Sequence, residues 1–206
     1  MKGTRIAGSI FVLLLGWLAF NISASGSVAR AATIPSVAGK ITEFRLPSHD
    51  SRPEGITLGP DGNLWFVQVK RNQVGRITPA GQVTEFTLPH TKSGPLFITS
   101  GPDGNLWFTE RRGNRIGRVT PTGQITEFSV PTGHSAPQGI TAGPDGNLWF
   151  TELTRNKIGR ITTSGKITEF PLASNNLPET ITAGPDGNLW FTVDISNQVG
   201  RITPTG

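Results

Sequence analysis

An eight-residue sequence, Gly-Pro-Asp-Gly-Asn-Leu-Trp-Phe, occurs four times in this chain of 206 residues. Two further phrases keep the same spacing: Val-Gly-Arg-Ile-Thr, first at Val74, and Ile-Thr-Glu-Phe, first at Ile41. A period of about 40–45 residues made of short strands is typical of β-propeller blades. The copies of the octapeptide are 42, 42 and 41 residues apart and begin at Gly59, Gly101, Gly143 and Gly184.

Each repeat is predicted to form four short antiparallel strands. The segments are rich in Val, Ile, Thr, Phe and Trp and are bounded by Gly, Pro, Asp or Asn. No helical periodicity is found after residue 33. The predicted fold is therefore all-β, a β-propeller of about four blades, and the first blade's strands are expected at 55–58, 63–67, 74–78 and 83–87.

The octapeptide combines a turn with a packing motif. Proline, Asp and Gly in Pro-Asp-Gly-Asn suit a tight turn in which Asp accepts a hydrogen bond and Gly takes a positive φ. A calcium loop is the alternative, but such a loop needs more oxygen ligands and a distal Glu. The tryptophan of each copy is expected to pack between neighbouring blades as a large buried aromatic.

Two charged residues recur in every repeat on the third and fourth predicted strands. They are the arginine of Val-Gly-Arg, first at Arg76, and the glutamate of Thr-Glu-Phe, first at Glu43 and then Glu85. Because these strands are neighbours, cross-strand ion pairs such as Arg76–Glu85 are expected. A residue present in every blade is a poor catalytic candidate, since an active site is asymmetric.

Residues 33–206 are predicted to form one repeat-built domain. The Ile41–Leu46 segment is a fourth-strand phrase without its own blade, and the last repeat lacks a fourth strand. Pairing 41–46 with the last blade would remove exposed edges and close a small four-bladed ring. The alternative is that the chain is part of a larger ring. The predicted blades span 54–88, 96–130, 138–172 and 179–206.

Residues 1–32 have the pattern of a secretory signal peptide. Lys2 and Arg5 are followed by an apolar run over 6–20 and by a small-x-small site at Ala29–Ala31. A retained membrane anchor is the alternative, although the run is shorter than a spanning helix needs. We therefore expect an exported protein, secreted or periplasmic, with no stable membrane span in the mature chain.

The composition argues against several kinds of site and partner. The chain has no cysteine, which excludes thiolate chemistry and cysteine-based metal sites. The formal net charge of +5 falls to +2 without the three basic residues of the predicted signal peptide. The densest basic cluster, Arg111, Arg112 and Arg115, has no interleaved aromatic residues, so nucleic-acid binding is not expected.

Chemistry is expected where the blades differ from one another. One variable position follows Leu-Trp-Phe-x, and another opens the first strand after a proline. Both lie at the same end of the strands, at the face where propellers bind ligands. Glu110 and Glu152 are the candidate metal ligands, because two carboxylates could converge on Mg²⁺; each could instead pair with a basic neighbour such as Arg155. Glu54, Gln138 and Glu179 are the candidate substrate-binding residues.

His49, His90 and His134 are the histidines of the chain. Each is predicted in a loop between a fourth strand and the next first strand, on the same face as the two glutamates. A loop histidine is commonly just solvated, but it can also act as a general base or metal ligand. These three are therefore the candidate catalytic residues.

The repeats resemble the virginiamycin B lyase (streptogramin lyase) family over residues 41–206. The resemblance rests on Gly-Pro-Asp-Gly-Asn-Leu-Trp-Phe-Thr-Glu, Asn-x-Ile-Gly-Arg-Ile-Thr and Ile-Thr-Glu-Phe. It implies a seven-bladed propeller that opens the lactone of type B streptogramins by elimination, with a histidine base and Mg²⁺ held by glutamates. It also implies a role in antibiotic resistance. Glu110 and Glu152 match the glutamate of Trp-Phe-Thr-Glu.

The chain departs from the family pattern at the base. The family histidine stands in Pro-His-x-Ile at the start of a first strand, where this chain has Glu54, Leu96, Gln138 and Glu179. Two functions therefore stay open. One is a streptogramin-lyase-like enzyme acting on a cyclic peptide ligand, and the other is a non-catalytic propeller that binds a small molecule, carbohydrate or peptide. An incomplete ring would favour an oligomer.

Overall fold

The computed structural model describes residues 39–173 and 176–206. The chain divides into two compact units, Met1–Thr42 and Glu43–Gly206, and the strands all belong to the second unit. The predicted signal peptide at 1–32 lies outside the described residues. Within the part of the chain that is described, no helix is long and apolar enough to cross a membrane.

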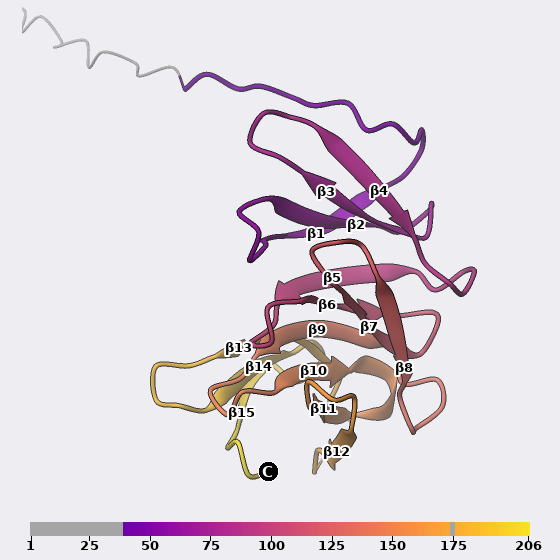
Figure 1. Cartoon of the computed structure of the whole chain (residues 1–206). Helices are drawn as coiled ribbons and strands as arrows, with labels where there is room; N and C mark the ends of the chain where they lie inside the picture. Colours follow the sequence, from indigo (N-terminus) through magenta and orange to yellow (C-terminus); the bar gives the residue numbers. More distant parts are fainter. Residues whose placement is uncertain (1–38, 174–175) are drawn as a thin grey trace, which may run out of the picture. The chain divides into compact units, whose positions relative to one another are not determined.

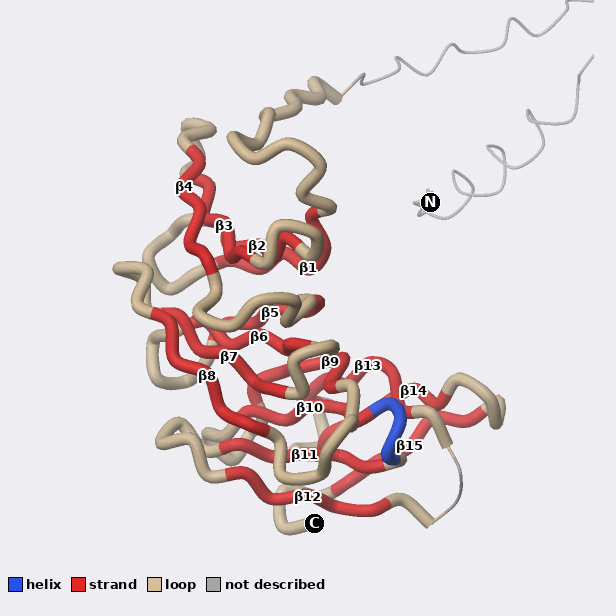
Figure 2. Tube along the Cα trace, turned by 90° about the vertical axis from the view of Figure 1, so that its right-hand side faces the viewer, coloured by secondary structure: helices blue, strands red, loops and turns tan. Residues whose placement is uncertain are grey.

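The second unit consists of four antiparallel sheets, each formed by consecutive strands in chain order (Figure 1). This is the predicted β-propeller architecture. One single-turn 3-10 helix, η2 (Leu153–Arg155), follows the tenth strand (Figure 2). The first two sheets comprise β1 (Pro53–Leu58), β2 (Leu64–Gln68), β3 (Gln73–Ile77), β4 (Val83–Thr87), β5 (Pro95–Ser100), β6 (Leu106–Glu110), β7 (Arg115–Val119) and β8 (Ile125–Ser129). The other two comprise β9 (Pro137–Ala142), β10 (Leu148–Glu152), β11 (Lys157–Ile161), β12 (Ile167–Pro171), β13 (Pro178–Ala183), β14 (Leu189–Val193) and β15 (Gln198–Ile202).

The turn between the first two strands of each blade forms as predicted. In the first blade Oδ1 of Asp61 accepts hydrogen bonds from the backbone N–H of Asn63 at 3.2 Å and from Nε1 of Trp65 at 3.0 Å. Gly62 has φ +75°, which glycine adopts without strain. The same Asp–Asn–Trp contacts recur in the other three blades. The motif is therefore a turn that also fixes the tryptophan.

The tryptophans of the first three blades pack between successive blades, as predicted, whereas Trp190 of the last blade is half-buried. Trp65 of the first blade shares a buried cluster with Ile98, Leu106 and Phe108 of the second. Trp107 and Trp149 are equally buried in the next two clusters. The innermost strands β1, β5, β9 and β13 lie beside one another in that order, as Figure 1 shows. Burial of one such aromatic removes about 150–250 Å² from water.

The predicted Arg76–Glu85 ion pair is wrong. In the β3–β4 register Arg76 lies opposite Thr84, and Glu85 lies opposite Gly75. Because side chains alternate between the two faces of a sheet, Arg76 and Glu85 point to opposite faces. Arg76 instead lies over the ring of Trp65 at 5.6 Å and donates from Nη1 to the carbonyl of Pro121 in the next blade at 3.0 Å.

The segment expected to close the last blade has a different position. Residues 43–46 form no strand, and among the described residues β15 has one strand neighbour, β14. The ring of Phe44 covers Gly81, with Cε1 2.3 Å from where a Cβ would lie. In the following blades Phe86 covers Gly123 in the same way. Phe44 thus occupies the place of a preceding blade's fourth-strand phenylalanine, against the first blade.

Candidate functional site

The first strand of every blade contains an irregularity at its second residue. The pairing of β9 with β10 shifts register between Glu152 and Phe150, and the other three blades show the same shift. An extra residue in one strand is a β-bulge, which re-aims side chains and is common beside functional sites. The bulge contains the variable position predicted as a ligand-binding site: Glu54, Leu96, Gln138 and Glu179.

In the last three blades a threonine from the second strand holds the bulge, and in the second and third blades it also joins the bulge of the next blade. Oγ1 of Thr151 accepts a hydrogen bond from the N–H of Gly139 at 2.9 Å and donates to the carbonyl of Glu179 at 2.7 Å. Oγ1 of Thr109 likewise donates to the carbonyl of Gln138 at 2.7 Å. The backbone at this position is therefore fixed by buried hydrogen bonds, and the side chains project from a rigid support.

The structure brings two of the three predicted substrate-binding residues together. Nε2 of Gln138 donates to Oε1 of Glu179 at 3.4 Å, across the boundary between the third and fourth blades. Gln138 is buried, and its Oε1 has no hydrogen-bond partner among the described residues. Glu54 is separate and pairs with Arg52 at 3.0 Å. Gln138 thus has a buried acceptor oxygen without a partner, beside the half-buried side chain of Glu179.

A second polar region lies where the second strand ends, and it has three members, which we call the interblade clusters. Each cluster has four members. They are the residue that ends the blade's second strand, the residue that opens its third strand, the glutamate of its fourth strand, and a loop residue that precedes its first strand. The three clusters are Ser48–Gln68–Gln73–Glu85, His90–Glu110–Arg115–Glu127 and Thr132–Glu152–Lys157–Glu169.

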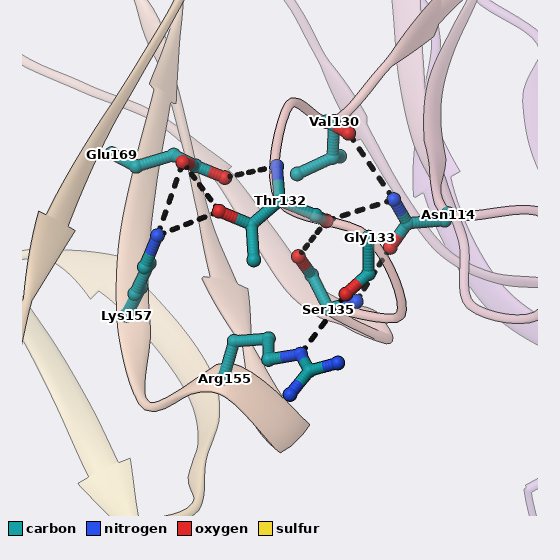
Figure 3. A network of polar contacts seen from close by, with 8 residues as sticks. All are labelled: Asn114, Val130, Thr132, Gly133, Ser135, Arg155, Lys157 and Glu169. Carbon is teal, nitrogen blue, oxygen red and sulfur yellow. Dashed lines mark hydrogen bonds and ion pairs between the residues drawn. The ribbon is translucent and has the colours of Figure 1, made fainter.

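The third cluster shows how the loop is held (Figure 3). Glu169 accepts hydrogen bonds from the N–H of Thr132 at 3.0 Å and from its Oγ1 at 2.8 Å, and pairs with Nζ of Lys157 at 3.2 Å. Burial raises the pKa of Glu169, but these hydrogen bonds outweigh it and hold the pKa below its usual value. The carboxylate therefore fixes the loop from the preceding blade.

Glu110 and Glu152 are fully buried in the second and third clusters. Their carboxyl oxygens have no hydrogen-bond partners among the described residues. Burial, reinforced by the neighbouring charges of Glu127 and Glu169, raises the pKa of each to about 7. At neutral pH a large share of each carboxyl is protonated, and the same position in the first blade is held by the neutral Gln68.

The joint magnesium site predicted at Glu110 and Glu152 stays a prediction. Glu110 and Glu152 lie in separate clusters, and each faces a basic residue, Arg115 or Lys157. In the described ranges, 39–173 and 176–206, no group of three or more His, Asp or Glu side chains could hold a metal ion. Arg155, the alternative partner of Glu152, donates to the carbonyl of Gly133 at 2.9 Å.

The three histidines lie in the predicted loops and are exposed, but their contacts differ. Nδ1 of His90 contacts Oε2 of the buried Glu127. His49 and His134 are engaged through their backbone carbonyls, which accept hydrogen bonds from Arg71 and Thr154. Of the three candidates, His90 is the one whose ring is oriented by a carboxylate, an arrangement that suits proton transfer.

Sequence reasoning missed the asparagines that position these loops. Asn114 has φ +55°, accepts a hydrogen bond from the N–H of Ser135 at 2.6 Å and donates to the carbonyls of Val130 and Thr132 (Figure 3). Asn72 makes equivalent contacts in the preceding blade. The signal was present, since asparagine opens the Asn-x-Val/Ile-Gly-Arg phrase and tolerates positive φ.

Comparison with known proteins assigns this chain to a family. The model of the virginiamycin B lyase family matches residues 16–206. The chain belongs to the virginiamycin B lyase family. The resemblance found in the repeat phrases is thereby confirmed.

Solved structures extend this relationship over most of the chain. The virginiamycin B lyase of Staphylococcus aureus is 52% identical, with a TM-score of 0.79, over 81% of this chain and 57% of that one. Its catalytically inactive histidine-to-alanine variant with quinupristin is 53% identical, with a TM-score of 0.79, over 81% and 57%. The virginiamycin B lyase of Bacillus licheniformis is 49% identical over 39 residues, 19% of this chain and 13% of that protein. The chain thus spans less than two thirds of these relatives.

Proposed function

We propose that this chain is a streptogramin-lyase-like propeller that binds a cyclic depsipeptide where β9 and β13 begin, and opens its lactone. One observation carries the proposal: the chain is about half identical to a S. aureus lyase whose inactive variant was solved with quinupristin. The fixed bulges and the unpartnered oxygen of Gln138 support this place for the ligand. A cyclic depsipeptide has backbone N–H donors that suit Gln138 and Glu179.

The reaction proposed is elimination rather than hydrolysis. A base removes the proton from the α-carbon of a residue in the ring. The neighbouring β-carbon carries the bond to the ester oxygen. That bond breaks as a carbon–carbon double bond forms, and the ester oxygen leaves as part of a carboxylate. No water is added, so the linear product has the mass of the cyclic substrate. Glu110 and Glu152 stay the candidate ligands for Mg²⁺, which would polarise the ester carbonyl when bound.

The test is to incubate the purified full chain with quinupristin, with Mg²⁺ or with a chelator, and to follow retention time and mass. A product with a new retention time and an unchanged mass supports the proposed elimination. A product heavier by one water means hydrolysis, and an intact substrate means that this chain does not catalyse the reaction. The S. aureus lyase is the positive control.

The second candidate is a non-catalytic propeller that binds the same class of ligand. It is favoured by the bulge positions, which carry Glu54, Leu96, Gln138 and Glu179 where the family pattern has histidine. Equilibrium binding of quinupristin with no change in its retention time would establish this function. Measuring quinupristin binding together with the retention time and mass of the product therefore distinguishes the two candidate functions.

Export and resistance belong to the same proposal. Cleavage near Ala31 would release the repeats outside the cytoplasm, as the apolar run over 6–20 and the small residues before Ala32 suggest. N-terminal sequencing of the secreted or periplasmic protein checks the cleavage site. Growth of a susceptible strain expressing the chain in the presence of quinupristin checks resistance.

A further inference from the structure

Two loops of the first blade are joined by an exposed ion pair. Nζ of Lys70, in the loop after β2, lies 2.7 Å from Oδ1 of Asp50, in the loop before β1. Beside this pair the backbone N–H of Lys70 donates to the carbonyl of Ser51 at 3.1 Å. The positions of Asp50 and Lys70 therefore face each other, within reach of a side-chain contact.

The second blade has the same backbone geometry at the two equivalent positions. The N–H of Arg112 donates to the carbonyl of Ser93 at 3.0 Å, which repeats the loop contact of the first blade. Lys92 has φ +59°, close to the φ of +52° at Asp50. Arg112 thus stands at the place of Lys70, and Lys92 stands at the place of Asp50.

This exchange replaces an ion pair by two like charges. The second blade has Lys92 where the first has an aspartate, so two cations face each other across the loops and repel. The third blade has His134 and Thr154 at these positions, and Oγ1 of Thr154 donates to the carbonyl of His134. An anion between Lys92 and Arg112 would turn the repulsion into two attractions.

The cations of these loops are available to a ligand. Lys92, Arg112 and the adjacent Arg111 are exposed, and their side chains make no hydrogen bond or ion pair with any residue of 39–173 or 176–206. The stem of Arg112 packs on Gly94, with its Cγ 3.1 Å from where a Cβ of Gly94 would lie. The guanidinium of Arg112 is therefore supported on the same loop that carries Lys92.

The carboxyls in this part of the second blade have other neighbours. The side chain of Glu127 is buried and contacts the ring of His90. Glu110 is fully buried and lies beside Arg115. The loop segments 89–94 and 111–115 contain no Asp or Glu. The positive charge of the exposed loop side chains is therefore not balanced locally.

We propose that Lys92, Arg111 and Arg112 bind a phosphate group of a ligand. A guanidinium can donate to two phosphate oxygens at once, and the ammonium of Lys92 adds a third donor and a compact charge. A dianionic phosphate balances two of the three positive charges, whereas a carboxylate balances one. The site uses neither Gln138 nor Glu179, so it is separate from the proposed lactone chemistry.

The variant Lys92→Asp tests the site, because it restores the charge arrangement of the first blade. Aspartate tolerates a positive φ better than lysine, so folding should be retained. The full chain is titrated with inorganic phosphate at low salt by calorimetry and by amide NMR shifts. We expect saturable binding by the wild-type chain, and a Kd at least about tenfold higher in Lys92→Asp. Lys166→Asp, at an exposed position between β11 and β12, changes the net charge equally and should keep the wild-type Kd.

A second measurement identifies the source of the phosphate group. The chain is sedimented with vesicles of phosphatidylglycerol and, as the control, of phosphatidylcholine. Binding to the anionic vesicles that inorganic phosphate displaces and Lys92→Asp abolishes would identify a lipid headgroup, and phosphate binding without vesicle binding would identify a soluble ligand. Absence of saturable phosphate binding, or equal changes of Kd in Lys92→Asp and Lys166→Asp, would overturn the proposal.

Discussion

Gln68 donates a hydrogen bond from Nε2 to Oε1 of Glu85 at 3.0 Å, at the position where the next two blades have Glu110 and Glu152. Glutamine and a protonated glutamic acid have nearly the same shape, and both are neutral. Because burial raises the pKa of Glu110 and Glu152 to about 7, all three interblade clusters have a neutral side chain beside a fourth-strand glutamate over much of the acidic range.

The first prediction concerns pH. In the unfolded chain both glutamates titrate near their usual pKa of about 4.3, so the folded state binds more protons between that pH and about 7. The raised pKa values of the two glutamates therefore add most to the free energy of unfolding below about pH 4. This contribution is lost as the pH rises to about 7 and does not change further at higher pH. Glu110→Gln and Glu152→Gln should stabilise the fold at pH 8 by roughly 1–3 kcal/mol each, with little effect at pH 4.

Urea denaturation at pH 4, 6 and 8 measures this effect. The control is Gln68→Glu, which should introduce the same pH-dependent loss in the first cluster. A Glu110→Gln variant whose gain in stability is equal at pH 4 and pH 8 would show that Glu110 does not titrate in this range.

The second prediction concerns the contact of glycine with phenylalanine. A Cβ on Gly117 would lie 2.1 Å from Cζ of Phe108, which is fully buried. Gly117→Ala should therefore lower the free energy of unfolding by roughly 1–3 kcal/mol through overpacking. Gly133→Ala is the control, because a Cβ there meets nothing within 4 Å. Equal unfolding midpoints for the two variants would refute the packing argument.

The third prediction concerns the arginine that joins two blades. Arg118 lies over Trp107 at 5.6 Å and over Phe128 at 5.7 Å, and donates to the carbonyl of Thr163. Arg118→Ala should destabilise the fold by roughly 1–3 kcal/mol, and Arg118→Lys should restore part of this loss. The exposed Arg111→Ala should change stability by less than about 0.5 kcal/mol. Thermal unfolding of the three variants measures these differences. If Arg118→Ala left the unfolding midpoint unchanged, Arg118 would not stabilise the contact between the two blades.

The fourth prediction concerns the turn aspartate. Asp145 accepts a hydrogen bond from Nε1 of the buried Trp149 at 3.0 Å. Asp145→Ala leaves this indole N–H without an acceptor and should cost roughly 1–3 kcal/mol of unfolding free energy. Lys70→Ala, which removes only an exposed ion pair with Asp50, should cost at most about 1 kcal/mol. Chemical denaturation at neutral pH compares the two variants, and a larger loss for Lys70→Ala would be the contrary result.

Much of the fold could be predicted because the same strand and turn phrases occur in four repeats. The turn at Asp61 and the burial of Trp65 depend on local sequence, and both are confirmed. The partner of Arg76 could not be predicted, because a register step of one residue reverses the face of a sheet. The position of Phe44 was missed because it depends on which blade is adjacent, and the repeat phrases are equivalent for every blade.

Less of the candidate site could be predicted. The variable positions were found by comparing blades, and the structure brings Gln138 and Glu179 together as neighbours. Glu110 and Glu152 were recognised as unusual, but their separation into two clusters depends on the direction of each side chain within its blade. The contact of His90 with Glu127 joins residues 37 positions apart in different blades, and no local pattern predicts it.

The most direct test of the proposed function is calorimetric titration of the full chain with quinupristin, compared with Gln138→Ala and Glu179→Gln. Asp50→Ala, with its change on an exposed loop, is the control, and the unfolding midpoint of each variant verifies its folded state. We predict saturable binding by the wild-type chain, with Kd raised at least about tenfold in both site variants and unchanged in the control. Absence of binding, or equal affinity in all four proteins, would contradict a ligand site at the start of β9 and β13.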